Sequence, residues 1–236
     1  MQIHLTLKCE EPFTVPLNYN YQLQSAVYSK LSEIGASDFW HNVGFGDNKQ
    51  KLKSFVFGPL TGTHIVENKK ITFTDEIHFE LRSPIFEFCD ELQRSFEINP
   101  IIKLFDTSLE VCGAALVNRH INNNRAIFKS LSPIVIHSTL PDKRTVFHSP
   151  DEGIFIQRLQ TNYQNKFQSL YNCEAPEISL KISENSQKIV TNYKGTWITG
   201  YKCRITAEGH FAALEFLYNS GLGEKNSQGF GMVDIW

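Results

Sequence analysis

Long hydrophobic runs are absent from this 236-residue chain, and no stretch approaches the roughly 20 apolar residues that span a membrane. The first residues, Met-Gln-Ile-His-Leu-Thr-Leu-Lys, alternate apolar and polar side chains and lack the basic-then-apolar plan of a signal peptide. We therefore expect no membrane partner and a cytoplasmic location. The hydrophobic content of 41% is enough for two small cores or one large core.

Cysteine pairs are also absent. The five cysteines lie far apart and form no Cys-x-x-Cys pair, which argues against a zinc site and against a disulfide framework. The sequence thus predicts no metal site and no cofactor. We expect reduced cysteines in the core, at Cys9, Cys89, Cys112, Cys173 and Cys203.

The chain has little net charge, −2, which counts against nucleic acid because phosphate-binding proteins gain affinity from lysine and arginine. The average hides a segregation of charge. Residues 1–120 carry 11 Lys/Arg and 15 Asp/Glu, whereas residues 121–236 carry 12 and 10. Lys49, Lys51 and Lys53 form a cluster in the first half, which is either a local basic face or a set of ordinary solvated side chains.

Four glycines gather near the end of the chain, in Gly221-Leu-Gly-Glu-Lys-Asn-Ser-Gln-Gly-Phe-Gly231. Glycine tolerates positive φ and has no Cβ, so this run favours a loop whose amides approach a ligand closely, with phosphate as the obvious candidate. The spacing matches neither a P-loop nor a dinucleotide fingerprint. The alternative is that the glycines only let the last helix turn onto the last strand.

The periodicity predicts the element order βαββαβ in the first half. Strands are expected over residues 2–9, 54–60, 71–73, 77–81 and 101–117. The segments 71–73 and 77–81 are expected to form a hairpin. Leu23, Val27 and Leu31 recur at helical spacing, and Pro84 opens a second helix.

The polar run 122–124 is the best candidate for a linker, and the second half repeats the same order. Strands are expected over 126–137 and at the C-terminus, with a hairpin of 177–182 and 188–205. Phe155, Leu159 and Tyr163 form a helical stripe, and Gly221 caps a last helix.

This order predicts an α+β fold of two tandem ferredoxin-like (RRM-like) domains with antiparallel sheets, at 1–120 and 121–236. The sequence signature of the RNA-recognition motif is absent. Aromatic residues at period two, Phe55, Phe57, Phe73 and Phe79, are either a base-stacking platform or, as we favour, part of the core.

The glycine-rich tail resembles the loop of the CRISPR repeat-processing endoribonucleases, the Cas-six family of the RAMP superfamily. The segment Val15-Pro-Leu-Asn-Tyr-Asn-Tyr-Gln-Leu-Gln-Ser-Ala-Val-Tyr28, then Trp40-His41, is similar to that family's opening helix and active-site loop. Lys53-Ser-Phe-Val-Phe57 and Phe128-Lys-Ser-Leu-Ser-Pro133 resemble later parts of the family. The similarity runs from end to end.

The resemblance implies an endoribonuclease that cuts CRISPR precursor RNA within repeats without a metal. The RNA's own 2′-hydroxyl attacks the adjacent phosphorus, which requires a base, an acid and positive charge at the phosphorane. His41 matches the catalytic histidine, Tyr28 the helix tyrosine and Lys53 the active-site lysine. The RNA-binding residues would be Lys49, Lys51, Gly221, Gly223, Lys225, Ser227, Gly229 and Gly231.

Two other functions stay open at this point. A non-catalytic subunit that binds mature crRNA in a CRISPR effector complex would share the fold and the glycine-rich loop; His41 favours the enzyme. A ferredoxin-like module for protein contacts is a more remote alternative. The sequence does not give the nucleotide sequence of the repeat or the oligomeric state, for which a homodimer is one option. It also does not show which of His41 and Tyr28 is the acid and which the base, or which of Lys49, Lys51 and Lys53 is in the active site.

Overall fold

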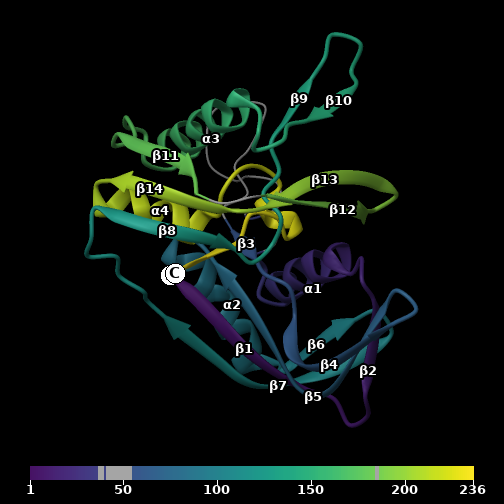
Figure 1. Ribbon diagram of the computed structural model, residues 1–236. Coiled ribbons are helices and arrows are strands. Elements are labelled where there is room, and N and C mark those ends of the chain that lie inside the picture. Colours follow the sequence, from purple (N-terminus) through teal and green to yellow (C-terminus); the bar gives the residue numbers. More distant parts are fainter. Residues whose placement is uncertain (37–39, 41–54, 184–185) are drawn as a thin grey trace.

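The structure is a computed structural model that describes residues 1–36, 40, 55–183 and 186–236 (Figure 1). His41, Lys49, Lys51 and Lys53 lie outside the described residues. Among the rest, two helix-covered sheets lie one above the other, and the N-terminal strands are in the lower one. The fold is α+β, with antiparallel sheets in the tandem ferredoxin-like arrangement that the sequence predicts.

The N-terminal unit is built on one antiparallel sheet of order β2-β5-β1-β7-β6, and β3 and β4 pair with β5 as well. Its order β4-β5-β1-β7 is that of a ferredoxin-like sheet. Leu23 of α1 and Phe88 of α2 belong to the same core as Leu5 of β1, so the apolar stripes of both helices pack on the sheet. The elements are β1 (Gln2–Lys8), β2 (Phe13–Pro16), α1 (Asn20–Glu33), β3 (Val56–Phe57), β4 (Thr61–Glu67), β5 (Lys70–Arg82), α2 (Phe86–Ile98), β6 (Ile101–Leu104) and β7 (Thr107–Val117).

One expectation for this unit is wrong. The hairpin predicted from residues 71–73 and 77–81 is a single continuous strand, β5. Asp75 and Glu76 have the character of turn residues, but they lie within the strand, with Asp75 exposed and Glu76 half-buried. Strand β4 pairs along β5 with a register shift between Gly62 and His64. The extra residue of such a bulge is absorbed by a bend, so the chain does not need to turn at the acidic pair.

The C-terminal unit has a sheet of order β11-β14-β8-β15, again ferredoxin-like, with two separate two-stranded ribbons, β9–β10 and β12–β13. Its elements are β8 (Arg125–Ser130), β9 (His137–Thr139), β10 (Thr145–Phe147), α3 (Gly153–Tyr171), β11 (Ile178–Ile182), β12 (Gln187–Tyr193), β13 (Thr196–Lys202), β14 (Arg204–Gly209), α4 (Phe211–Ser220), the 3-10 helix η2 (Asn226–Gln228) and β15 (Val233–Ile235).

Two strand predictions for this unit are corrected. Residues 177–182 pair with β14, whereas β12 pairs with β13. Lys194 and Gly195 both have positive φ, 51° and 82°, which is the geometry of a tight type I′ hairpin turn that closes the ribbon on itself. The strand expected over 126–137 ends at Ser130, where the amides of Leu131 and Ser132 leave the ladder and donate to the Met232 carbonyl.

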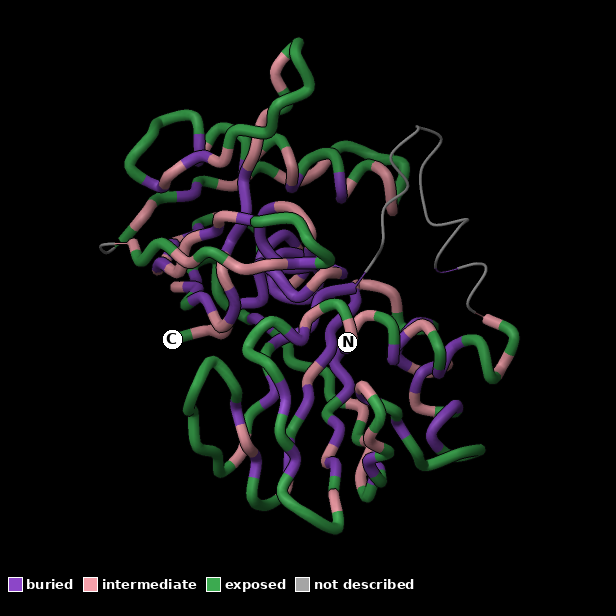
Figure 2. The backbone as a smooth tube through the Cα atoms, turned by 90° about the vertical axis from the view of Figure 1, so that its right-hand side faces the viewer, coloured by how far each residue is buried: buried purple, intermediate pink, exposed green. Residues whose placement is uncertain are grey.

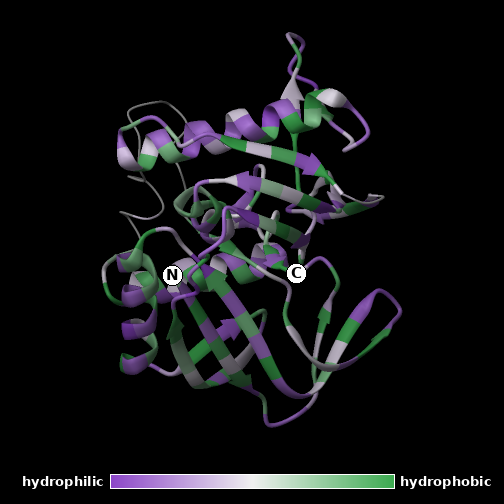
Figure 3. Cartoon of the chain, turned by 60° about the vertical axis from the view of Figure 1, so that its left-hand side comes forward, coloured by the Kyte–Doolittle hydropathy of each residue, from purple (hydrophilic) through white to green (hydrophobic). Residues whose placement is uncertain are grey.

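Each unit has its own hydrophobic core, and a third small cluster joins Val135, Tyr193, Ile198 and Phe230. Buried segments gather where the two units meet, and exposed ones lie at the hairpin tips (Figure 2). Along the sheet strands, apolar and polar residues alternate (Figure 3). The core alternative for the period-two aromatic residues is confirmed, because four rings are at most 2% exposed: Phe55, Phe57, Phe73 and Phe79.

The cysteine prediction holds in part. All five are free, and Cys89 and Cys203 are buried, but Cys112 and Cys173 are exposed. Cys112 is on the outward face of β7, opposite the face that carries Val111, so strand alternation placed it outside the core. None of the helices among the described residues is long and apolar enough to cross a membrane.

Candidate functional site

The glycine-rich loop, residues 221–231, is packed into the protein. Gly221 ends α4 with a φ of 76°, η2 forms one short turn, and the chain then enters β15. Most of the loop is buried, whereas Glu224, Lys225 and Gln228 are half-buried. Lys225 has a φ of 60°, a left-handed conformation that a residue with a Cβ rarely adopts.

Three of the four glycine amides are used within the protein. The amide of Gly221 donates to the Leu217 carbonyl (3.0 Å), that of Gly229 to Asn226 (3.0 Å) and that of Gly231 to Pro133 (2.8 Å). A Cβ at Gly231 would overlap the Leu222 carbonyl oxygen. These glycines therefore allow close packing between the last helix and the last strand, and the RNA contacts predicted for them stay a prediction.

Two polar side chains brace the loop from within. The Asn226 amide donates to the carbonyls of Leu222 (3.1 Å) and Phe230 (3.0 Å), so it ties the two ends of the loop together. The Lys166 amine, from α3, donates to the Gly221 carbonyl (3.0 Å) and to Asn226 Oδ1 (2.6 Å).

Lys166 is almost fully buried beneath the loop. Burial lowers its pKa to about 7, and the carboxylate of Glu224 opposes this effect. A neutral amine still has two N–H groups, so both hydrogen bonds survive deprotonation. The sequence analysis missed Lys166 and Asn226. Lys166 lies three residues after Tyr163, within the apolar stripe of its helix. A lysine within an apolar stripe was the sequence feature that could have identified it.

One face of α1 contacts the loop. Asn20, Gln24 and Tyr28 follow at intervals of four residues, so they lie on the same side of the helix. Asn20 Nδ2 donates to the Gln228 carbonyl (3.0 Å), and Gln24 Nε2 donates to the Ser227 carbonyl (2.7 Å). The structure thus brings the helix of Tyr28 and the loop of Ser227 together, although they come from opposite ends of the chain.

Tyr28 is half-buried one helical turn beyond Gln24. Its ring makes an edge-to-face contact with Phe55, with the centroids 5.7 Å apart. Burial raises the pKa of Tyr28 above its ordinary value, and Tyr193 adds to the effect. The phenol is therefore protonated near neutral pH and suits hydrogen bonding to a hydroxyl or phosphate better than proton abstraction.

The described residues that flank positions 41–54 are Trp40 and Phe55. Trp40 and Phe55 both contact the Phe88 ring of α2, at centroid distances of 5.2 Å and 4.7 Å, and Phe55 also contacts Tyr28. The Trp40 indole N–H donates to Glu91 (2.5 Å). Trp40 and Phe55, the described residues on either side of positions 41–54, therefore both pack on α2.

Lys225 and Ser227 line a polar cleft between the loop and α3. Arg158 and Asn162 of α3 form the opposite wall, and the Arg158 guanidinium donates to the His137 carbonyl (3.2 Å). Glu224 lies in the same cleft and pairs with His137. The cleft thus offers amide and cationic donors around the half-buried Lys225.

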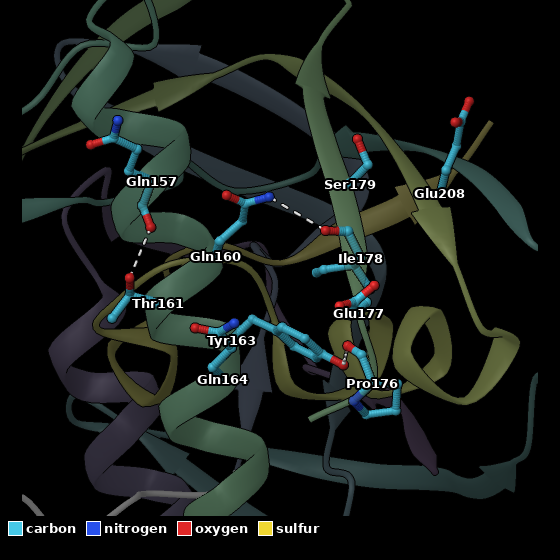
Figure 4. A pocket seen from close by; sticks show the side chains of 10 residues that line it. All are labelled: Gln157, Gln160, Thr161, Tyr163, Gln164, Pro176, Glu177, Ile178, Ser179 and Glu208. Carbon is cyan, nitrogen blue, oxygen red and sulfur yellow. Dashed lines mark hydrogen bonds between the residues drawn. The ribbon is translucent and has the colours of Figure 1, made fainter. Parts of the chain in front are cut away.

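A second hollow lies on the other side of α3, against β11 (Figure 4). Tyr163 donates to the Pro176 carbonyl (2.9 Å), and Gln160 reaches the Ile178 carbonyl (3.4 Å). Glu177 and Glu208 also line this hollow. Among the described residues, no lysine or arginine lines this hollow beside its two carboxylates, whereas three cationic side chains line the cleft at the glycine-rich loop beside the one carboxylate of Glu224: Arg158, Lys166 and Lys225. Because carboxylates repel phosphate and cations attract it, that cleft is the better place for an anionic ligand.

Comparisons with known proteins agree with this architecture. Residues 116–235 match the family model described as CRISPR associated protein Cas6, C-terminal. The chain is 24% identical to CRISPR-associated endoribonuclease Cas6 1 of Methanocaldococcus jannaschii, over 99% of this chain and 92% of the relative. It is 26% identical to a putative CRISPR-associated endoribonuclease-like protein Cas6 of Pyrococcus furiosus, over 94% and 92%.

Two solved structures share the whole fold. A CRISPR associated protein Cas6 aligns with a TM-score of 0.84 at 23% identity, over 100% of this chain and 99% of the other. A structure described as an RAMP protein binding different RNA substrates aligns with the same TM-score at 20% identity and the same coverage.

Proposed function

This chain belongs to the CRISPR-associated Cas6 family, and we propose on that basis that it is a metal-independent endoribonuclease that cuts CRISPR precursor RNA within repeats to give mature crRNA. The observation that carries this proposal is the contact between α1 and the glycine-rich loop. Gln24 bonds Ser227, and Tyr28 follows one turn later on the same helix face. A tyrosine suited to hydroxyl chemistry is thus close to a loop that is suited to hold RNA.

The proposed reaction is an internal transesterification. The 2′-oxygen forms a bond to the adjacent phosphorus, the bond from phosphorus to the 5′-oxygen breaks, and the products are a 2′,3′-cyclic phosphate and a 5′-hydroxyl. The proton of the 2′-hydroxyl goes to a base, and an acid protonates the leaving 5′-oxygen. His41 is proposed as the principal acid or base and Lys53 as the cation at the phosphorane.

Tyr28 is proposed to orient the 2′-hydroxyl by a hydrogen bond. Its raised pKa supports this role, since a protonated phenol both donates and accepts a hydrogen bond. Lys225 and Ser227 are proposed to contact RNA phosphates from the cleft at α3, together with Lys49 and Lys51. The substrate is an RNA transcript, so we place the protein in the cytoplasm.

A second candidate function is a non-catalytic crRNA-binding subunit, whose partners would be other CRISPR effector subunits. The observation that favours it is the 26% identity to a protein named endoribonuclease-like. The glycine-rich loop and α1 would then hold RNA without cutting it.

The test uses purified protein in EDTA with a repeat RNA from its own genome, and the same RNA with one 2′-deoxy substitution before the cut. We expect cleavage of the first RNA only. His41→Ala should lower the cleavage rate by about 10²–10⁴-fold, the usual contribution of a general acid or base, and leave binding unchanged. Cleavage that requires a metal contradicts the mechanism, and tight binding without cleavage supports the non-catalytic subunit.

A further inference from the structure

The β12–β13 ribbon has one anchored face. Tyr193 and Ile198 are buried on it and belong to a small cluster with Val135 and Phe230, the last of which is in the glycine-rich loop. The Tyr193 hydroxyl also donates to Gln24 of α1. The ribbon is thus held firmly against both the loop and the helix of the proposed active site.

The opposite face of the ribbon is open and carries aromatic side chains. The register pairs Asn192 with Trp197 and Lys188 with Tyr201, so these four residues share a face. The side chains of Ile198 and Tyr193 are on the other face of the ribbon. Trp197 is 63% exposed, and Val190 on the same face is 51% exposed. Because most of this indole is exposed to solvent, it contributes little to the packing of the ribbon.

The ribbon is also basic. Residues 187–202 contain three lysines, Lys188, Lys194 and Lys202, and no acidic residue, in a chain whose net charge is −2. Surfaces that bind single-stranded nucleic acid combine a positive charge with aromatic rings on which bases stack. Protein–protein interfaces are instead depleted of lysine, so this composition favours nucleic acid over a protein partner.

The turn of the ribbon lies over the start of α1. The Asn192 amide donates to Asn18 (3.4 Å), and the Lys194 amine lies 5.0 Å from the centre of the Tyr21 ring. Tyr28 follows seven residues later on the same helix, about 10 Å away along its axis. A single RNA strand that passes Tyr28 therefore reaches the ribbon within a short distance, and Figure 1 shows β12 and β13 extending above α1.

We propose that the outer face of β12–β13 is a stacking surface for unpaired nucleotides of the RNA substrate, with Trp197 as its main ring and with Lys188 of the same face and Lys194 of the turn as phosphate contacts. This inference rests on the proposed function, because it assigns part of the same substrate to a second surface. Asn192 and Thr199 on the same face add hydrogen-bonding groups for base edges.

The test measures the Kd of two fluorescein-labelled RNAs: a repeat RNA with a 2′-deoxy block at the cut, and a short single-stranded RNA of mixed sequence. Trp197→Ala should weaken binding of both by about 5- to 100-fold, the loss expected for one stacked base. Trp197→Phe, which keeps a ring, should restore most of the affinity.

Trp236→Ala is the matched control, since Trp236 is 70% exposed and belongs to the C-terminal end of the chain. We expect it to bind like the wild type. Unchanged affinity in Trp197→Ala, or equal losses in both alanine variants, overturns the ribbon proposal. No binding of either RNA by the wild type overturns it as well.

The two proposals fail separately. Wild-type protein that binds RNA in a Trp197-dependent manner but cuts no repeat RNA supports the stacking surface and contradicts the proposed enzyme. Wild-type protein that cuts repeat RNA while Trp197→Ala binds normally supports the enzyme and contradicts the stacking surface.

The lysines are tested by the salt dependence of binding. Each phosphate contact on a single strand contributes about 0.7 to the slope of log K against log salt. Lys188→Gln combined with Lys194→Gln should therefore lower the slope by about 1.4, whereas Trp197→Ala should leave it unchanged, because stacking releases no counterions. A slope that the double variant leaves unchanged contradicts the assigned phosphate contacts.

Discussion

The two halves of this protein repeat one ferredoxin-like sheet order and differ in what is added to it. The N-terminal unit adds β2, β3 and β6 to its own sheet, so the additions enlarge its core. The C-terminal unit adds two ribbons and a buried glycine-rich loop outside its sheet. The same frame therefore supports a helix with a candidate catalytic tyrosine in one half and candidate RNA-holding surfaces in the other.

Charge follows the same division. Residues 1–120 have a net charge of −4, and residues 121–236 have +2. This difference in charge supports the proposal that the catalytic residues are in the first half and most of the RNA contacts in the second. Three substitutions test this comparison, one at a contact between the units and two within the C-terminal unit.

The largest effect is expected where the units are joined by a buried cation. Arg82 of β5 donates to the Val233 carbonyl of β15, and its guanidinium lies 3.8 Å from the centre of the Tyr218 ring. It also pairs with Glu80, which is three-quarters buried. Arg82→Leu removes the guanidinium donor from this carboxylate and carbonyl, and we expect a loss of about 3–5 kcal/mol in the free energy of unfolding.

Urea unfolding followed by tryptophan fluorescence measures that loss. If the units are coupled through Arg82, the variant should also unfold in two steps instead of one. The control is Arg94→Leu, at an exposed position of α2, which should change stability by less than about 0.5 kcal/mol. Equal stability of the two variants would show that Arg82 does not hold the units together.

A smaller effect is expected within the C-terminal unit. Gly231 has a φ of 75°, and a Cβ there would overlap the Leu222 carbonyl oxygen. Gly231→Ala adds this clash to the backbone strain, and we expect about 2–4 kcal/mol of destabilisation by thermal or urea unfolding.

Gly195→Ala tests the cost of backbone strain in the absence of a steric clash. Gly195 has a φ of 82° at the turn of the β12–β13 ribbon, but a Cβ there meets no atom within 4 Å among the described residues. This variant should lose only about 1–2 kcal/mol, the cost of a left-handed alanine. If both alanine variants lose the same amount, close packing is not what the loop requires of Gly231.

The smallest effect concerns the pH dependence of stability. Lys166 has a pKa of about 7 in the folded protein, lowered by burial from its ordinary value of 10.5. Between these values the unfolded chain holds a proton that the folded protein lacks, so this group makes stability rise with pH. The free energy of unfolding of the wild type, relative to Lys166→Met, should therefore increase from pH about 7 to pH about 9.

The measurement is urea unfolding at several pH values. Lys188→Met, at an exposed position of β12, is the control. Its free energy of unfolding should change with pH in parallel with that of the wild type. Parallel curves for wild type and Lys166→Met would show that the buried amine keeps its proton.

Local patterns predicted the helices well and the strand partners less well. Phe155, Leu159 and Tyr163 correctly indicated α3, and Gly221 correctly indicated the end of α4. The predicted pairing partner of residues 177–182 was wrong. A strand pattern shows that a segment is extended but not which distant segment pairs with it. The type I′ turn at Lys194 and Gly195 was a local signal for the correct pairing.

The sequence by itself determined the helices, the two-unit order and the spacing that puts Asn20, Gln24 and Tyr28 on one helix face. These features depend on neighbours within a few residues, so periodicity is enough to reveal them.

Only the tertiary structure decided that this helix face meets the glycine-rich loop, since Gln24 and Ser227 are 203 residues apart. It also decided that Lys166 is buried and that Trp197 is exposed. The pKa of an amine and the exposure of a ring are set by the atoms around them in the folded chain, and those atoms come from distant segments.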